Sequence, residues 1–323
     1  MNLHENKDAF AAAIQLASTP KQEGGLGIKQ IYIEKDYWIC RSLKQLSECK
    51  ESEVAVFKGG TSLSKAYLLG NRFSEDIDIA ITSDSQRTDN QTKNIISRIS
   101  KVMSAGLEEV PNPATRKYSK YRKAFYRYPV SIENEIIGAI NPGQILLEIV
   151  SFANPYPYQK VFIKSFLTEY LENVGRNDII EAYGMQGFEI QVLAKSRTAT
   201  EKLVSLIRHS LSADYISELK AKIRHFYDLY FLWNDPESRA YLESAEFKTD
   251  FKALISSDQA RFKEPEGWCD KKVSDSPLIS SFDIVWSELQ ETYSKELPEL
   301  AYQAIPSPES VAKSFKELSV LLI

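Results

Sequence analysis

The spacing of apolar residues divides the chain into an α/β first part and a helical second part. Helical periodicity is predicted over residues 7–18, 33–46, 61–69 and 90–107. Runs typical of strands lie between these segments, at residues 53–57, 76–79, 118–130 and 145–152. From about residue 198 the pattern is helical, with breaks at Asp235-Pro236 and Glu264-Pro-Glu-Gly267. We therefore expect an α/β domain over residues 1–190 and a mostly helical lobe over residues 191–323.

One predicted strand ends on Lys58, Gly59 and Gly60, and a helix follows at once. Neither glycine has a Cβ, so the backbone can approach a ligand closely there. The unpaired N–H groups at the start of a helix, together with the hydroxyls of Thr61 and Ser62, suit a phosphate. The same residues also suit an ordinary strand-to-helix turn capped by a hydroxyl. This motif alone leaves both interpretations open.

Two carboxylates lie on the next predicted strand. Residues two apart on a strand point to the same face, so Asp76 and Asp78 converge, while Ile77 marks the buried face. Two close anions repel unless a cation lies between them, and Mg²⁺ or Mn²⁺ accepts such carboxylates together with substrate phosphates. The alternative is an exposed edge strand of alternating charge. Because the two motifs are so close in the sequence, we expect one site for a phosphate group and a metal ion.

Residues 115–128 form a basic segment that contains no acid. Its basic residues are Arg116, Lys117, Lys120, Arg122, Lys123 and Arg127. Five aromatic residues alternate with them: Tyr118, Tyr121, Phe125, Tyr126 and Tyr128. Since basic groups follow phosphates and rings stack on bases, the segment is a candidate RNA- or nucleotide-binding surface. The alternative is an exposed antiparallel strand whose lysines discourage edge pairing.

Composition narrows the class of protein. The 40 basic and 44 acidic residues leave a net charge of −4, which argues against coating nucleic acid through bulk charge. Three scattered cysteines indicate neither a disulfide framework nor a zinc site, so we expect a reducing cytoplasm. Neither a signal peptide nor a long apolar run is present, so no membrane association is expected. The hydrolase Gly-x-Ser-x-Gly and Walker-type phosphate loops are also absent.

The motifs together resemble a known family. An apolar residue, Gly-Gly, a spacer and Asp-apolar-Asp are similar to the signature of DNA polymerase β-like nucleotidyltransferases. Phe57-Lys-Gly-Gly-Thr-Ser-Leu-Ser64 with Phe73-Ser-Glu-Asp-Ile-Asp78 resembles the AbiEii toxin family of abortive-infection systems. Glu34-Lys-Asp-Tyr-Trp38, Ala199-Thr-Glu-Lys-Leu203 and Arg224-His-Phe-Tyr-Asp-Leu229 are similar to other motifs of that family. The resemblance covers residues 30–235 and does not reach the C-terminal part of the chain.

The resemblance implies a nucleotidyltransferase-type mixed sheet flanked by helices, and a role for each matched residue. Asp76 and Asp78 would hold the metal ions that bridge the nucleotide phosphates. Glu148 would be a third carboxylate on a neighbouring strand. Lys202 would neutralise triphosphate charge, and Asp228 would orient Lys202 or the base. His225 departs from the pattern, since relatives often carry Asp there, and Asp228 is the acid retained nearby.

The function implied is that of a metal-dependent toxin of a toxin–antitoxin or phage-defence system. It would transfer a nucleoside monophosphate from an NTP to an acceptor hydroxyl, with pyrophosphate leaving. In related toxins the acceptor is the 3′ end of tRNA, so we expect a tRNA acceptor and a cognate antitoxin, whose direct binding stays open. Two alternatives are a protein hydroxyl as acceptor and a catalytically silent nucleotide- or RNA-binding module. The intact acidic pair and glycines argue against the silent module.

Overall fold

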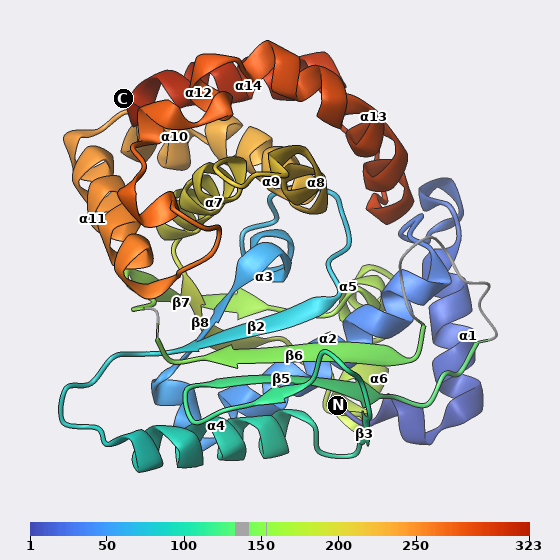
Figure 1. Ribbon diagram of the computed structural model, residues 1–323. Helices are drawn as coiled ribbons and strands as arrows, with labels where there is room; N and C mark the ends of the chain where they lie inside the picture. Colours follow the sequence, from blue (N-terminus) through green and yellow to red (C-terminus); the bar gives the residue numbers. More distant parts are fainter. Residues whose placement is uncertain (133–141, 153) are drawn as a thin grey trace. The chain divides into compact units, whose positions relative to one another are not determined.

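The computed structural model describes residues 1–132, 142–152 and 154–323, and the chain divides into two units (Figure 1). The sheet unit comprises Met1–Tyr67 and Phe73–Leu193. The helical unit comprises Leu68–Arg72 and Ala194–Ile323. Five residues from the first part of the chain thus belong to the helical unit, which the hydrophobic pattern gave no reason to expect.

A mixed sheet forms the centre of the sheet unit. Within the described ranges, eight strands lie in the order β3-β5-β6-β2-β1-β8-β7, and β4 pairs with β5. Their bounds are β1 Ala55–Lys58, β2 Asp76–Ile81, β3 Glu108–Val110, β4 Arg116–Lys117, β5 Tyr121–Arg127, β6 Gln144–Val150, β7 Tyr158–Ile163 and β8 Phe188–Leu193. β2 and β6 run parallel, as do β1 and β8, whereas the other pairs run antiparallel. The predicted α/β class with a mixed sheet flanked by helices is confirmed.

Helices cover both faces of this sheet. They are α1 Lys7–Ser18, α2 Gln30–Ser47, α3 Gly59–Ala66, α4 Asp89–Met103, α5 Phe166–Asn173 and α6 Asn177–Ala182. Trp38 of α2 stacks on Tyr128 at 5.4 Å between ring centroids, and Ser100 of α4 hydrogen-bonds Tyr126 of β5 at 2.9 Å. The apolar side chains of β2 and β6 that face α2 and α4, such as Ile77 and Leu147, are buried. α3 lies on the opposite face from α4 (Figure 1).

The helical unit packs around α9. Its helices are α7 Lys195–Ser210, α8 Tyr215–Ala221, α9 Ile223–Asn234, α10 Pro236–Leu242, α11 Ala245–Arg261, α12 Pro277–Ser280, α13 Phe282–Leu300 and α14 Pro308–Ser319. Phe226 of α9 contacts the rings of Phe282, Trp286 and Phe315 from α13 and α14. The break at Asp235-Pro236 is explained by capping, because the Asp235 carboxylate accepts the Ser238 N–H at 2.9 Å. The predicted helical lobe is confirmed.

Several predicted elements end earlier than the pattern indicated, among them one helix and one strand near the acidic residues. The helix predicted to residue 69 ends at Ala66, because Leu68 and Gly70 adopt left-handed backbone conformations with φ of 53° and 78°. The strand predicted over residues 118–130 is β5 at Tyr121–Arg127, which forms a hairpin with β4 at Arg116–Lys117. Of the helices that the structure describes, none is both long and apolar enough to cross a membrane.

Candidate active site

A row of charged residues crosses the sheet on one face. Asp78 of β2 pairs with Lys58 of β1 on one side and with Glu148 of β6 on the other. Glu148 in turn pairs with Lys123 of β5, whose other neighbour is Arg116 of β4. Paired residues of adjacent strands share a face, so these five side chains form one line, in which two adjacent acidic groups lie between basic groups. The sheet register therefore brings Glu148 beside Asp78, although 69 residues separate them in the sequence.

Asp76 lies on the same face of β2 as Asp78, because the two residues are two apart on the strand. Both are partly exposed, whereas Ile77 between them is buried. Across the described ranges, no group of three or more His, Cys, Asp or Glu side chains is arranged to hold a metal ion. Two carboxylates on one face of a strand suit an ion whose other ligands are substrate phosphates and water, as is usual for Mg²⁺.

Gly59 packs directly against this acidic strand. Its φ is 82°, and a Cβ at this position would lie 2.1 Å from Oδ2 of Asp78. No real side chain tolerates that distance, so glycine is required both for the backbone conformation and for the close approach. α3 begins at this residue, and its first N–H groups have no partner within the helix. The first turn of α3 and the Asp78 carboxylate therefore meet at one point.

The hydroxyls of Thr61 and Ser62 are buried and bonded to backbone carbonyl groups. Thr61 Oγ1 donates to the main-chain oxygen of Asp76 at 2.5 Å, and Ser62 Oγ donates to that of Gly59 at 2.8 Å. Thr61 thus fixes the start of β2 to α3, and Ser62 binds back to the carbonyl of the first residue of α3. The sequence left a phosphate and the turn itself open as partners of these hydroxyls, and in the structure both donate to carbonyl groups of the turn and of β2.

Buried ion pairs from α2 support both elements of the site. Lys35 Nζ lies 2.5 Å from the Glu75 carboxylate, next to the start of β2. Asp36 pairs with Lys65 of α3 at 2.7 Å and accepts the Phe166 N–H at 2.6 Å. The motif at residues 34–38, which the resemblance placed near the start of the family pattern, is therefore buried structure that positions α3 and β2.

Glu34 in the same helix carries a pH-sensitive carboxyl. Burial, opposed by the hydrogen bond from the Ser131 N–H at 2.6 Å, raises the pKa of Glu34 from 4.5 to about 7. Between these values the folded state holds a proton that the unfolded state has lost. The protonated carboxyl therefore contributes its full share to the free energy of unfolding below pH 4.5. This contribution is lost as the pH rises through about 7.

Replacing Glu34 by Gln is expected to remove this dependence while keeping the oxygen that accepts the Ser131 N–H. The free energy of unfolding of the wild type should fall between pH 4.5 and pH 8 by about 3 kcal/mol more than that of the variant. Urea unfolding of both proteins at the two pH values measures this difference. The exposed Glu288→Gln is the control and should follow the wild-type curve. Parallel wild-type and Glu34→Gln stabilities across this range would contradict the assignment.

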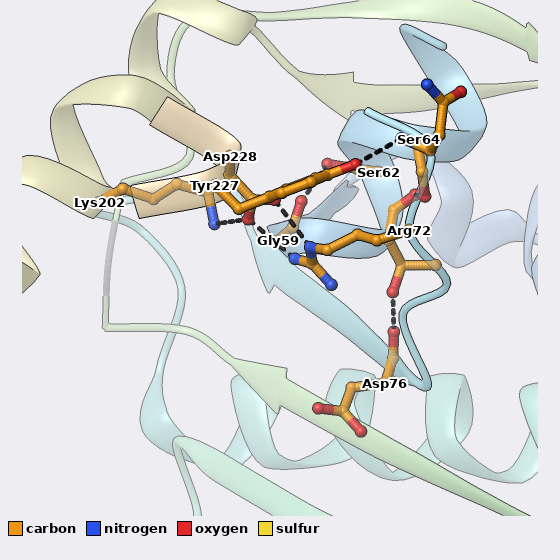
Figure 2. A network of polar contacts seen from close by, with 10 residues as sticks. Gly59, Ser62, Ser64, Arg72, Asp76, Lys202, Tyr227 and Asp228 are labelled. Atoms are coloured by element: carbon orange, nitrogen blue, oxygen red, sulfur yellow. Dashed lines mark hydrogen bonds and ion pairs between the residues drawn. The ribbon is translucent and has the colours of Figure 1, made fainter. Parts of the chain in front are cut away.

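A second charged cluster lies within the helical unit (Figure 2). Arg72 donates from Nε and Nη2 to the two carboxylate oxygens of Asp228, at 2.9 and 2.8 Å. Lys202 Nζ lies 2.7 Å from Oδ2 of the same carboxylate. All three side chains are at most 8% exposed. Arg72 was not among the predicted site residues, because nothing in the sequence links it to an acid 156 positions away.

The charges of this cluster fix its protonation. Burial would raise the pKa of Asp228, but Arg72 and then Lys202 outweigh burial and hold that pKa far below its ordinary value. Burial and the charge of Lys202 lower the pKa of His225 well below its ordinary value. At neutral pH Asp228 is thus an anion and His225 is neutral. His225, the departure from the family pattern, therefore adds no charge to the cluster.

The predicted basic surface is divided between the two faces of the sheet. Lys123 Nζ lies 3.9 Å from Glu148 on the face of the acidic pair, and Arg116 shares that face. Lys117 pairs with Arg122 on the opposite face. Exposed ion pairs join Lys117 to Glu109, Lys120 to Asp89 and Arg127 to Glu108. Tyr121, on the same face as Lys123, hydrogen-bonds Glu148, and burial and that carboxylate raise its pKa to about 12.

The chain matches a known protein family over most of its length. A family model described as nucleotidyl transferase AbiEii toxin, of a type IV toxin–antitoxin system, matches residues 41–315. The match extends through most of the helical unit, beyond the point at which the sequence resemblance was expected to end. A comparison with curated proteins found no match.

Two solved structures are similar in outline. MenT4, a nucleotidyltransferase toxin from Mycobacterium tuberculosis, has 15% identity and a TM-score of 0.45, covering 97% of this chain and 98% of its own. A candidate nucleotidyltransferase from H. pylori has 16% identity and a TM-score of 0.35, covering 85% of this chain and 100% of its own.

Proposed function

Because the chain belongs to the AbiEii nucleotidyltransferase toxin family, we propose that it transfers a nucleoside monophosphate from an NTP to the 3′-terminal hydroxyl of a tRNA. The observation that supports this most directly is the row of Asp78 and Glu148 beside Gly59, with Asp76 on the same face. This row offers acidic oxygens for a metal ion directly beside the free N–H groups of a helix N-terminus, which suit phosphate.

In the proposed reaction the acceptor hydroxyl oxygen attacks the α-phosphorus, and the bond to the β-phosphate oxygen breaks. Asp76 and Asp78 would hold Mg²⁺ or Mn²⁺, which when bound neutralises the phosphates and activates the hydroxyl. Glu148 lies next to Asp78 and would take the proton that the acceptor hydroxyl loses. The departing group is pyrophosphate.

Phosphate recognition is proposed to use the backbone at the first turn of α3, since the Thr61 and Ser62 hydroxyls are already bonded. Lys58, at the end of β1, adds a cation beside Asp78. Lys202 would neutralise the triphosphate, with Asp228 holding its ammonium group in place. A cation that is already in place stabilises the charge on the leaving pyrophosphate without any free-energy cost for rearranging the site.

The acceptor RNA is proposed to lie along the face of β5 and β6 that carries the acidic row. Lys123 and Arg116 would contact its phosphates, and the rings of Tyr121 and Phe125 are available for stacking on this face. A cognate antitoxin is the proposed regulatory partner and the cytoplasm the proposed compartment, because NTPs and tRNA are found there.

The test incubates the protein with Mg²⁺, each α-labelled NTP in turn and total RNA, beside an Asp76→Ala control. Label in a tRNA-sized band, absent from the control, is the expected result and also identifies the nucleotide. Label in protein and not in RNA would instead support the nucleotidylation of a protein hydroxyl. NTP binding without any transfer would support the catalytically silent module.

If RNA lies along this face, substitutions of two adjacent basic residues should affect RNA binding differently. Arg116→Gln should weaken RNA binding and reduce the slope of log affinity against log salt by about 1, because one phosphate contact is lost. Lys117→Gln is the matched control, since Lys117 pairs on the other face and binds Glu109. Filter binding of labelled tRNA from 50 to 200 mM salt measures both slopes (roughly the range in which counterion release dominates). Equal slopes for the two variants would rule out this path.

A further inference from the structure

A short loop of the chain belongs to the helical unit although the elements on either side of it belong to the sheet unit. This crossing loop is Leu68–Arg72, between α3 and β2. Only three residues separate its last member, Arg72, from Asp76. The crossing loop is therefore a short covalent connection between the acidic strand and the unit that carries Lys202.

The backbone of the crossing loop is held at several points within the helical unit. The Asn71 N–H donates to Tyr227 Oη at 2.8 Å, and the Tyr302 N–H donates to the Asn71 carbonyl at 2.9 Å. Arg72 forms an isolated β-bridge with Ala301. Gly70 has a φ of 78°, and a Cβ there would lie 3.0 Å from the Tyr227 ring. The loop thus has one well-defined conformation, determined by α9 and by the residues after α13.

Arg72 adds the strongest of these contacts. Its guanidinium forms a two-point contact with Asp228, at 2.9 and 2.8 Å, and the whole pair is buried. Lys202 shares the Asp228 carboxylate at 2.7 Å (Figure 2). A carboxylate fixed in orientation by a planar guanidinium holds the ammonium of Lys202 at a defined place. A lysine in place of Arg72 would supply charge but not this two-point geometry.

The other end of the connection is equally fixed, within the sheet unit. Phe73 is buried and stacks on Tyr32 at 5.0 Å between centroids. Glu75 is paired with Lys35 at 2.5 Å. The residues between Arg72 and Asp76 are therefore held by contacts of the sheet unit itself, whereas Arg72 is held by contacts of the helical unit.

We propose that Arg72 is a positioning residue of the transfer reaction, which is itself held by the crossing loop and orients Lys202 through Asp228. This inference rests on the proposed function. Arg72 need not touch the nucleotide in this role. Its loss displaces the cation meant for the triphosphate.

The test is Arg72→Lys, which keeps the positive charge and removes the two-point contact. We expect a rise of about tenfold in the KM for the NTP and a fall of about 10- to 100-fold in kcat, since small misplacements of binding groups are costly. The matched control is Arg208→Lys on the same helix as Lys202, where Arg208 pairs with Asp258 at 3.5 Å. The control should keep kcat and KM within about twofold. Wild-type kinetics in Arg72→Lys, or equal losses in both variants, would overturn the inference.

A second variant covers the case in which Arg72→Lys does not fold, as circular dichroism would reveal. Tyr227→Phe removes the hydroxyl that accepts the Asn71 N–H and leaves the ion pairs untouched. It should lower kcat/KM for the NTP by about three- to tenfold, the loss of one hydrogen bond. An unchanged kcat/KM in Tyr227→Phe would count against the anchoring role of the loop.

Calorimetric titration with ATP, GTP, CTP and UTP in the presence of Mg²⁺ separates this inference from the proposed function, because binding needs no acceptor. A wild type that binds an NTP but transfers nothing would refute the proposed transfer. In that case a tenfold weaker Kd in Arg72→Lys would still support positioning of Lys202, and an equal Kd would refute it. A wild type that binds no NTP would overturn both.

Discussion

Replacing Asp78 by Asn is expected to lower the rate of nucleotide transfer by at least about a thousandfold. The amide keeps the shape of the side chain but removes the charge that a metal ion requires. Metal-ion stabilisation of a developing phosphate charge is worth several kcal/mol, and about 4 kcal/mol corresponds to a factor of 10³. Initial rates with labelled NTP and saturating RNA, over a range of Mg²⁺ concentrations, measure the effect.

The control for this variant is Glu109→Gln, which removes an acid from the exposed edge strand β3. It should retain the wild-type rate, because Glu109 pairs with Lys117 and lies outside the acidic row. Thermal unfolding of both variants shows whether the fold is kept. If folded Asp78→Asn keeps more than about a tenth of the rate, Asp78 does not hold the metal ion.

The second large effect is expected from Gly59→Ala, which should reduce transfer by about 10²- to 10³-fold. The added methyl group would lie 2.1 Å from Oδ2 of Asp78, so the carboxylate, the helix start or both must move. The backbone φ of 82° adds about 1–2 kcal/mol of strain for any residue with a Cβ. Activity and the free energy of unfolding should therefore both fall.

Gly175→Ala separates the effect of backbone strain from the effect of the collision with Asp78. Gly175 has a φ of 72°, but a Cβ there would meet nothing within 4 Å. This variant should show the backbone strain without the collision, and so lose stability while keeping its rate of transfer. Equal activity of the two folded alanine variants would mean that the close approach of Gly59 to Asp78 has no role in transfer.

Much of the fold could be predicted because its helices and central strands have clear hydrophobic periods. β8 was not predicted, although apolar and polar residues alternate over most of residues 188–193. β3 and β7 offered little, because they lie at the edges of the sheet and most of their side chains are exposed. An edge strand with few buried residues leaves no period in the sequence.

The candidate site was predictable where its geometry is local. The shared direction of Asp76 and Asp78 follows from the period of a strand, and the close approach at Gly59 follows from the absence of a Cβ. Strand order and long-range pairing are not local properties. The contact between Arg72 and Asp228 joins residues 156 positions apart, and the buried pair of Asp36 and Lys65 looks like surface charge in the sequence.

The crossing loop makes the helical unit discontinuous in the chain, and this limits how the protein can be divided. A fragment that ends at Leu193 would keep Arg72 and Asn71 but lose Asp228, Tyr227 and Tyr302. The complementary fragment would bury Asp228 with Lys202 and without its guanidinium partner. Truncations and split-protein reporters that separate the two parts at residue 193 should therefore yield two unstable pieces, whereas a circular permutant opened in an exposed loop of either unit keeps every partner.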